Sequence, residues 1–182
     1  ANMLGREPKR LRGMATLPLQ DVGASMDELE RIAKLGCFRG VEMGTSVEGA
    51  LIAAPQFRPL LKRIEQLRMF VLAHPYQPSP KGGLDRYYLI SSMGFPLDTS
   101  LLAAHLMASG ALDELKSLQF ILPHGGGFLP YLIGRLEHAY HARPEPRANT
   151  ATTPREHLKR FMFDALTHDP FAARCLIDTV GA

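Results

Sequence analysis

Two histidines stand at comparable places in the sequence, each at the end of a short apolar run. His74 closes the run MFVLAH and precedes Pro75, and His124 closes QFILPH and precedes Gly125. In a parallel α/β protein, side chains at the carboxyl ends of strands form the catalytic rim. An imidazole at such a place can bind a divalent metal or transfer a proton near neutral pH. We therefore predict that His74 and His124 are functional residues.

Three glycines follow His124 in the stretch LPHGGGF. Glycine is the costliest residue to order, so a triplet indicates backbone that must come close to something. A histidine followed by glycines also marks the oxyanion-hole loop of some α/β-hydrolases, but that fold needs a serine elbow of the form G-x-S-x-G. The sequence contains no such elbow, because the stretch GTSVEG that begins at Gly44 is one residue too long.

The alternative chemistry is a divalent metal held by imidazole and carboxylate, with a second imidazole free to move protons to or from water. Two metals would need a bridging carbamylated lysine, and the strand that ends at Glu42-Met43-Gly44 offers none. A single metal ion is therefore expected.

The other histidines are interpreted as structural. His105, His138, His141 and His157 fall within helical patterns, where a solvated or partly buried surface histidine is typical. His138 and His141 could share a helix face, but we find no acidic or sulfur companion at the helical spacing that a metal site would need. His168 adjoins a helix start, where it caps or packs.

The elements that position these residues alternate between short apolar runs and longer segments with helical periodicity. The runs predicted as strands are Gly13–Leu17, Gly40–Gly44, Met69–His74, Gln119–His124 and Phe161–Leu166. This alternation predicts parallel strands with helical crossovers, hence an α/β protein. No G-x-G-x-x-G follows the first strand to favour a doubly wound sheet, and polar residues at several strand ends favour a (β/α)8 barrel.

Helix start and stop signals lie between the runs. A capping box over Ser25–Glu28 predicts a helix that Gly36 closes. The other signals predict helices over Pro55–Arg68 and Asp98–Ser109, helix starts at Thr153-Pro154 and Asp169-Pro170, and a surface loop over Ala142–Thr153. A full barrel usually needs about 250 residues. We therefore expect the 182 residues to form a single domain, 1–182, that is an internal portion of one barrel without its N-terminal and C-terminal strands.

Composition excludes several classes of protein. With 46% apolar and 21% charged residues, the chain has the balance of a soluble globular protein. No apolar run reaches the roughly 18 residues of a membrane span, and no signal peptide is evident, so a cytoplasmic location is expected. The net charge of +3 comes from scattered basic residues without interleaved aromatics, which favours a small anionic substrate over nucleic acid. Cys37 and Cys175 are expected to be reduced.

The order of several motifs along the whole chain resembles a known family. These motifs are RLRGMATLPLQD, FRGVEMGTSVEG, MFVLAHPY, GFPLDTSLLAAHLMASGALD, LQFILPHGGGFLPYLIGRLEHA and FMFDALTHDP. They are similar to the amidohydrolase-related (amidohydrolase 2) metal enzymes typified by aminocarboxymuconate semialdehyde decarboxylase. The segment from His124 to Arg135 is the most specific of them.

The resemblance implies a distorted (β/α)8 TIM-type barrel with one divalent ion, expected to be zinc. By motif, His74 matches a metal ligand and His124 the catalytic histidine that handles water or the proton. Arg135 matches an arginine that binds the substrate carboxylate in a neighbouring subunit, which implies a homodimer and suits guanidinium geometry.

The sequence also departs from the family pattern. It contains no H-x-H, which usually supplies two metal ligands, and it ends before the expected aspartate ligand of the eighth strand, so His74 is the one matched ligand of four. Tyr76 stands where tryptophan is more usual, which argues against the muconate substrate itself. We predict a metal-dependent lyase that decarboxylates an unsaturated or aromatic carboxylate. The alternatives are a hydrolase or hydratase of a related lactone or unsaturated acid, and a non-catalytic barrel fragment.

Overall fold

The larger sheet of the protein consists of parallel strands that run side by side in the order β1-β2-β5-β6-β7. The computed structural model describes residues 2–7, 9–76 and 82–181. The strands are β1 (Gly13–Thr16), β2 (Phe38–Met43), β5 (Phe70–Ala73), β6 (Phe120–Leu122) and β7 (Phe161–Phe163). All the apolar runs predicted as strands are confirmed, because a buried parallel strand is apolar along its length and stands out in a sequence.

The register of the sheet aligns one residue from every strand in a single row. Thr16 pairs with Glu42, Glu42 with Leu72, Leu72 with Ile121, and Ile121 with Met162. Since β5 and β6 are parallel neighbours in this register, the residues that follow them emerge at the same edge of the sheet. A separate antiparallel pair is formed by β3 (Ser46–Val47) and β4 (Ala50–Leu51).

Helix α2 (Val22–Leu35) connects β1 to β2, and its start corrects the sequence prediction. The N-cap is Asp21, whose side chain accepts the Ala24 N–H at 3.0 Å. Ser25 lies inside the helix and is fully buried. Gly36 ends the helix in the left-handed conformation (φ 67°), as predicted.

The remaining helices follow the predicted order with shifted boundaries. The predicted helix over Pro55–Arg68 is a 3-10 turn, η1 (Pro55–Phe57), followed by α3 (Arg58–Gln66), and the next helix begins at Phe95 rather than Asp98. The capping box of Thr153 and Glu156 and the Asp169 cap are both confirmed. The other elements are α1 (Asn2–Arg6), the π-helical turn η2 (Ile90–Gly94), α4 (Phe95–Ala108), α5 (Ala111–Glu114), η3 (His124–Gly126), α6 (Leu129–Ala142), η4 (Glu145–Arg147), α7 (Pro154–Leu158) and α8 (Pro170–Val180).

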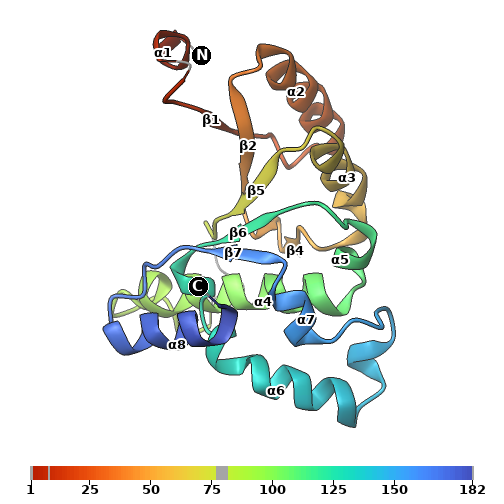
Figure 1. Ribbon diagram of the computed structural model, residues 1–182, viewed down its shortest axis with the longest axis vertical. Helices are drawn as coiled ribbons and strands as arrows, with labels where there is room; N and C mark the ends of the chain where they lie inside the picture. Colours follow the sequence, from red (N-terminus) through yellow and green to blue (C-terminus); the bar gives the residue numbers. More distant parts are fainter. Residues whose placement is uncertain (1, 8, 77–81, 182) are drawn as a thin grey trace.

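The core lies between one face of the sheet and the helices that cover it. Figure 1 shows α2 and α3 together on one side of β2 and β5. The side chains of Val41, Val71 and Phe120 are fully buried on the covered face. On the other face, Met14 and Met162 are 45% and 48% exposed. None of the described helices is long and apolar enough to cross a membrane.

Candidate active site

The fold brings the two strand-end histidines together. His74 directly follows β5 and His124 lies just beyond β6, and their ring centroids are 5.1 Å apart in an edge-on arrangement. Phe95, at the start of α4, completes a group of three rings, with centroids 6.2 Å from His74 and 6.1 Å from His124. The prediction that both histidines lie at one edge of the sheet is confirmed.

The backbone around His74 fixes the direction of its imidazole. The His74 N–H donates to the Met43 carbonyl at 2.9 Å, which ties the residue to β2. Its Nδ1 lies 2.9 Å from the Pro75 carbonyl oxygen. A carbonyl only accepts, so this bond places the proton on Nδ1 and leaves the Nε2 lone pair free. Metal-binding histidines are commonly oriented by this kind of second hydrogen bond.

His124 occupies a strained and partly buried position. Its backbone is left-handed (φ 59°), a conformation that costs an L residue roughly 1–2 kcal/mol. Its Nδ1 atom is buried and has no hydrogen-bond partner among the described residues. Burial lowers the pKa of His124, the neighbouring His74 lowers this pKa further, and the Asp164 carboxylate opposes the change. The neutral imidazole is therefore favoured.

The glycines after His124 are required by close contacts as well as by their backbone conformation. Gly125, Gly126 and Gly127 all have positive φ, at 60°, 76° and 65°. A Cβ at Gly125 would lie 2.7 Å from Thr167 Cγ2, and one at Gly126 would lie 2.6 Å from Phe163 Cε1. The triplet therefore lets the turn pack directly on the segment that follows β7.

The far end of the same turn is held against α4. A Cβ at Gly127 would overlap the Pro96 carbonyl oxygen, so a side chain is excluded there. The Phe128 N–H donates to Ser100 Oγ at 2.7 Å, and that hydroxyl donates to the Pro96 carbonyl at 2.7 Å.

A cavity of about 720 Å³ opens beside His124, within the size range of small-molecule sites. Its walls combine hydroxyl groups, two tyrosine rings and apolar side chains, and they come from the η2 region, the glycine turn, α6 and α8. Its hydroxyl, tyrosine and imidazole side chains belong to Tyr88, Ser91, Ser92, His124, Tyr131, Thr167 and His168. His168, expected to cap or pack, is exposed and lines this cavity.

Arg135 lies about one helical turn beyond Tyr131, which does line the cavity. It is exposed on α6 and is not among the residues that line the cavity beside His124. The described residues offer it no hydrogen bond or ion pair within the chain. The structure therefore does not bring Arg135 together with His74 and His124, and its role stays a prediction.

Two residues beside His124 were missed by sequence reasoning. Phe95 stacks on the His124 ring at an interplanar angle of 26°, and no local signal distinguishes it from a core phenylalanine. Asp164 follows β7 directly. The strand-end rule that selected His74 and His124 would have selected Asp164 as well, had the predicted strand ended at Phe163 instead of Leu166.

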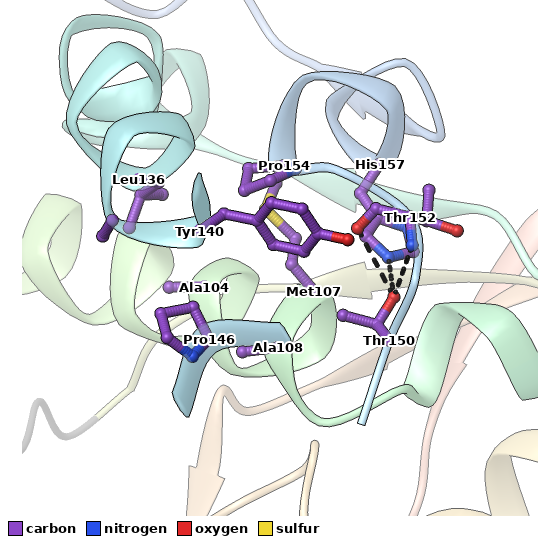
Figure 2. Close-up of a pocket in the computed structure, with 11 residues that line it drawn as sticks. Ala104, Met107, Ala108, Leu136, Tyr140, Pro146, Thr150, Thr152, Pro154 and His157 are labelled. Carbon is purple, nitrogen blue, oxygen red and sulfur yellow. Dashed lines mark hydrogen bonds between the residues drawn. The ribbon is translucent and has the colours of Figure 1, made fainter. Parts of the chain in front are cut away.

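Among the other histidines, His157 is a correction. It is 1% exposed rather than at the surface, and it lines a cavity of about 70 Å³ between α4, α6 and α7 (Figure 2). This cavity lies near the start of β7, at the opposite end of that strand from the glycine turn. His105, His138 and His141 are exposed, as expected. His141 does have an acidic companion at helical spacing, since its Nε2 lies 3.4 Å from Glu137 Oε1, which corrects the sequence analysis.

The amidohydrolase family matches residues 1–182, the whole chain. The chain belongs to this family. The 2-amino-3-carboxymuconate-6-semialdehyde decarboxylase of Dictyostelium discoideum is 33% identical over 183 residues, which cover 100% of this chain and 51% of that protein. The chain thus spans about half the length of the curated relatives it matches.

Solved structures of decarboxylases have the same fold. The 2,6-dihydroxybenzoate decarboxylase from Rhizobium superposes with a TM-score of 0.86 at 29% identity, over 99% of this chain and 60% of that one. A dihydroxybenzoic acid decarboxylase from Polaromonas sp. JS666, with bound manganese and the inhibitor 2-nitroresorcinol, superposes with a TM-score of 0.85 over 99% of this chain and 58% of that one, and at 24% identity this likeness shows the fold. The prediction of a portion of a TIM-type barrel is confirmed.

In this amidohydrolase chain, the residues present fit part of a metal site. The free Nε2 of His74 is a suitable imidazole donor. The described residues contain no group of three or more His, Cys, Asp or Glu side chains that could hold a metal ion. His74 therefore offers one candidate donor, and a complete donor set is not found in the described part of the chain.

Proposed function

We propose that this chain forms part of a metal-dependent carbon-carbon lyase that decarboxylates an aromatic or unsaturated carboxylate. The pairing of His74 with His124, beside a cavity that contains both aromatic and hydroxyl groups, is the observation that supports it. The named activities of its relatives, which are decarboxylases of ring or muconate carboxylates, support the same reaction.

Within this proposal the two histidines have different tasks. His74 holds one divalent ion through Nε2, and the bound ion supplies Lewis-acid polarisation of a substrate oxygen. His124, whose neutral imidazole is favoured, transfers a proton from water to the carbon that loses carbon dioxide. The carbon-carbon bond breaks, its electron pair stays on the substrate carbon, and the proton forms the new C–H bond. We propose zinc as the ion because imidazole and carboxylate ligands suit it, and manganese is the alternative.

The cavity supports an aromatic or conjugated substrate. The rings of Tyr88 and Tyr131 offer surfaces on which a flat substrate can stack, and Ser91 and Ser92 offer hydroxyl groups to its polar substituents. Phe95 packs against both imidazoles and contributes a third ring beside them.

We propose that Arg135 binds the substrate carboxylate in a neighbouring copy within a homodimer. Its exposure on α6 and its absence from the described lining of the cavity of its own chain support this assignment. A reducing, cytoplasmic location is supported by Cys37 and Cys175, which are both free thiols.

The deciding experiment is a carbon dioxide release assay with the full-length protein, loaded in turn with zinc and manganese, against a panel of aromatic and unsaturated carboxylates. Release from at least one of them, abolished by a chelator and restored by the metal, is expected. Turnover of a lactone or an unsaturated acid without carbon dioxide release would replace the lyase with a hydrolase or hydratase. Failure to bind stoichiometric metal would favour a non-catalytic barrel element.

A further inference from the structure

A carboxylate with no part in the proposed chemistry lies beside the glycine turn. Asp164 directly follows β7, and its backbone N–H donates to the Leu122 carbonyl at 3.3 Å. This bond continues the pairing of β6 with β7 by one residue. The Asp164 side chain is thereby held at the edge of the sheet where His124 is located.

The Asp164 carboxylate accepts hydrogen bonds from the backbone on both sides. Its Oδ1 accepts the Gly125 N–H at 2.8 Å and the Leu166 N–H at 3.1 Å. Gly125 is buried, and its N–H finds no backbone acceptor among the described residues. A buried donor that loses its acceptor is penalised, and a bond to an ionised acceptor is stronger than a neutral one. The carboxylate is therefore the group that satisfies this donor.

The geometry of His124 explains why such a tie is needed. His124 and the three glycines after it form an unbroken stretch of positive φ, between 59° and 76°. Strained backbone of this kind persists only where its surroundings over-determine it. The bonds within the turn, Gly126 N–H to the Pro123 carbonyl and Gly127 N–H to the His124 carbonyl, move with the turn and cannot fix it in space.

Among the described residues, two side chains from other elements hold the turn through hydrogen bonds to its backbone. Ser100 holds its far end through the Phe128 N–H, whereas Asp164 holds Gly125, the residue bonded directly to His124. A rotation of the peptide between His124 and Gly125 would break the Asp164 bond and would swing the imidazole away from His74.

We propose that Asp164 is a positioning residue, whose bond to the Gly125 N–H holds the His124 imidazole in its working direction. This inference rests on the proposed role of His124 in proton transfer. Asp164 acts through the backbone and does not touch the substrate.

The test compares Asp164→Leu and Asp164→Ser, which remove the carboxylate, with Asp164→Asn, which keeps an oxygen acceptor. Asp178→Asn is the control, because Asp178 is an exposed carboxylate on α8 paired with Arg174. Amide hydrogen exchange of residues 124–128 is measured in the full-length protein by NMR. Steady-state decarboxylation and metal content are measured on the same samples.

Both removal variants are expected to speed exchange at Gly125 by about tenfold or more. We also expect kcat to fall by about ten- to a hundredfold through misplacement of His124, with KM and metal content little changed. Asp164→Asn should recover most of the protection and of kcat, and Asp178→Asn should resemble the wild type.

The inference would be overturned if the Gly125 amide in the two removal variants were as protected from exchange as in the wild type. It would also be overturned if Asp164→Asn lost as much protection and kcat as Asp164→Leu. These outcomes are separate from failure of the proposed function. If the wild-type protein releases no carbon dioxide from any substrate, the lyase proposal fails, while the exchange data still decide whether Asp164 holds the turn.

Discussion

His157 Nε2 lies 3.1 Å from Thr150 Oγ1, inside a part of the protein closed to solvent. The same hydroxyl oxygen accepts the Thr152 N–H at 3.1 Å, so it links the loop to α7. Figure 2 shows these bonds at one end of the cavity that Tyr140 also lines. The nearest carboxylate, Asp113 Oδ1, is 3.8 Å from Nε2. The site thus favours an uncharged imidazole.

Acidification should therefore destabilise the fold through His157. Burial lowers the pKa of His157 in the folded protein, and Asp113 opposes this change. In the unfolded chain the imidazole has a pKa of about 6.5. At a pH between these two pKa values, the His157 imidazole is protonated in the unfolded state but not in the folded state. The free energy of unfolding should fall as the pH falls from about 6.5 through the lower folded pKa.

Urea unfolding on either side of that pH measures the effect. His157→Gln should weaken the pH dependence, and His105→Gln, at an exposed position on α4, should leave it unchanged. An equal pH dependence in His157→Gln and the wild type would contradict the assignment.

Under the proposed roles, substitution of His74 and of His124 should have different effects on metal content and activity. His124→Ala should lower kcat by about 10²- to 10⁴-fold, the usual contribution of a proton-transfer group, with metal content retained. His74→Ala should lower metal content together with activity, because it removes a donor. Metal content and turnover are measured for both variants, and His105→Ala is the control. Full activity in His124→Ala would refute its role.

Gly127 and Gly36 compare a crowded glycine with an open one. Their ψ angles differ, at −124° for Gly127 and −5° for Gly36, so only Gly36 has the left-handed conformation. Both have φ near +65°, at 65° and 67°, but a Cβ at Gly36 would meet nothing within 4 Å, whereas one at Gly127 would overlap α4. Gly36→Ala should cost about 1 kcal/mol for its φ alone. Gly127→Ala should cost about 1–3 kcal/mol more through overpacking. Denaturant midpoints measure the stability of both variants. An equal loss of stability in the two would show that α4 moves to accommodate the added Cβ at Gly127.

One substitution of Asp21 and one of Ser25 test which residue caps the start of α2. Asp21→Ala should destabilise the protein by about 1 kcal/mol, because it removes the acceptor for the Ala24 N–H. Ser25→Ala should be neutral or stabilising, since Ser25 Oγ is buried without a hydrogen-bond partner. Thermal and urea unfolding measure both losses of stability. If Ser25 were the cap, Ser25→Ala would destabilise the protein more than Asp21→Ala.

Part of the site could be predicted because its signals are local. Each histidine ends an apolar run, and neighbouring parallel strands end at one edge, so His74 and His124 could be paired from the sequence. The start of α2 could not be placed, because Asp21 and Ser25 are both acceptable caps and periodicity continues through both. The difference is decided by packing, which buries Ser25.

Other features depend on segments distant in sequence. His157 lies on a short helix with polar neighbours in sequence, and its burial comes from Thr150 and from helices α4 and α6. The glycines indicated a close approach, but their partners come from β7 (Phe163), the loop after it (Thr167) and α4 (Pro96). Local pattern alone does not reveal such contacts.

The row that joins Thr16, Glu42, Leu72, Ile121 and Met162 limits where the length of this chain can change. Deletion of one residue inside β5 would exchange the two faces of the strand beyond it and turn His74 away from His124. An insertion in the crossover between β5 and β6 would leave both registers intact and add only a modest entropy of loop closure. Variation in length among natural or engineered versions should therefore be concentrated in the connections, with the strands and the glycine turn kept at constant length.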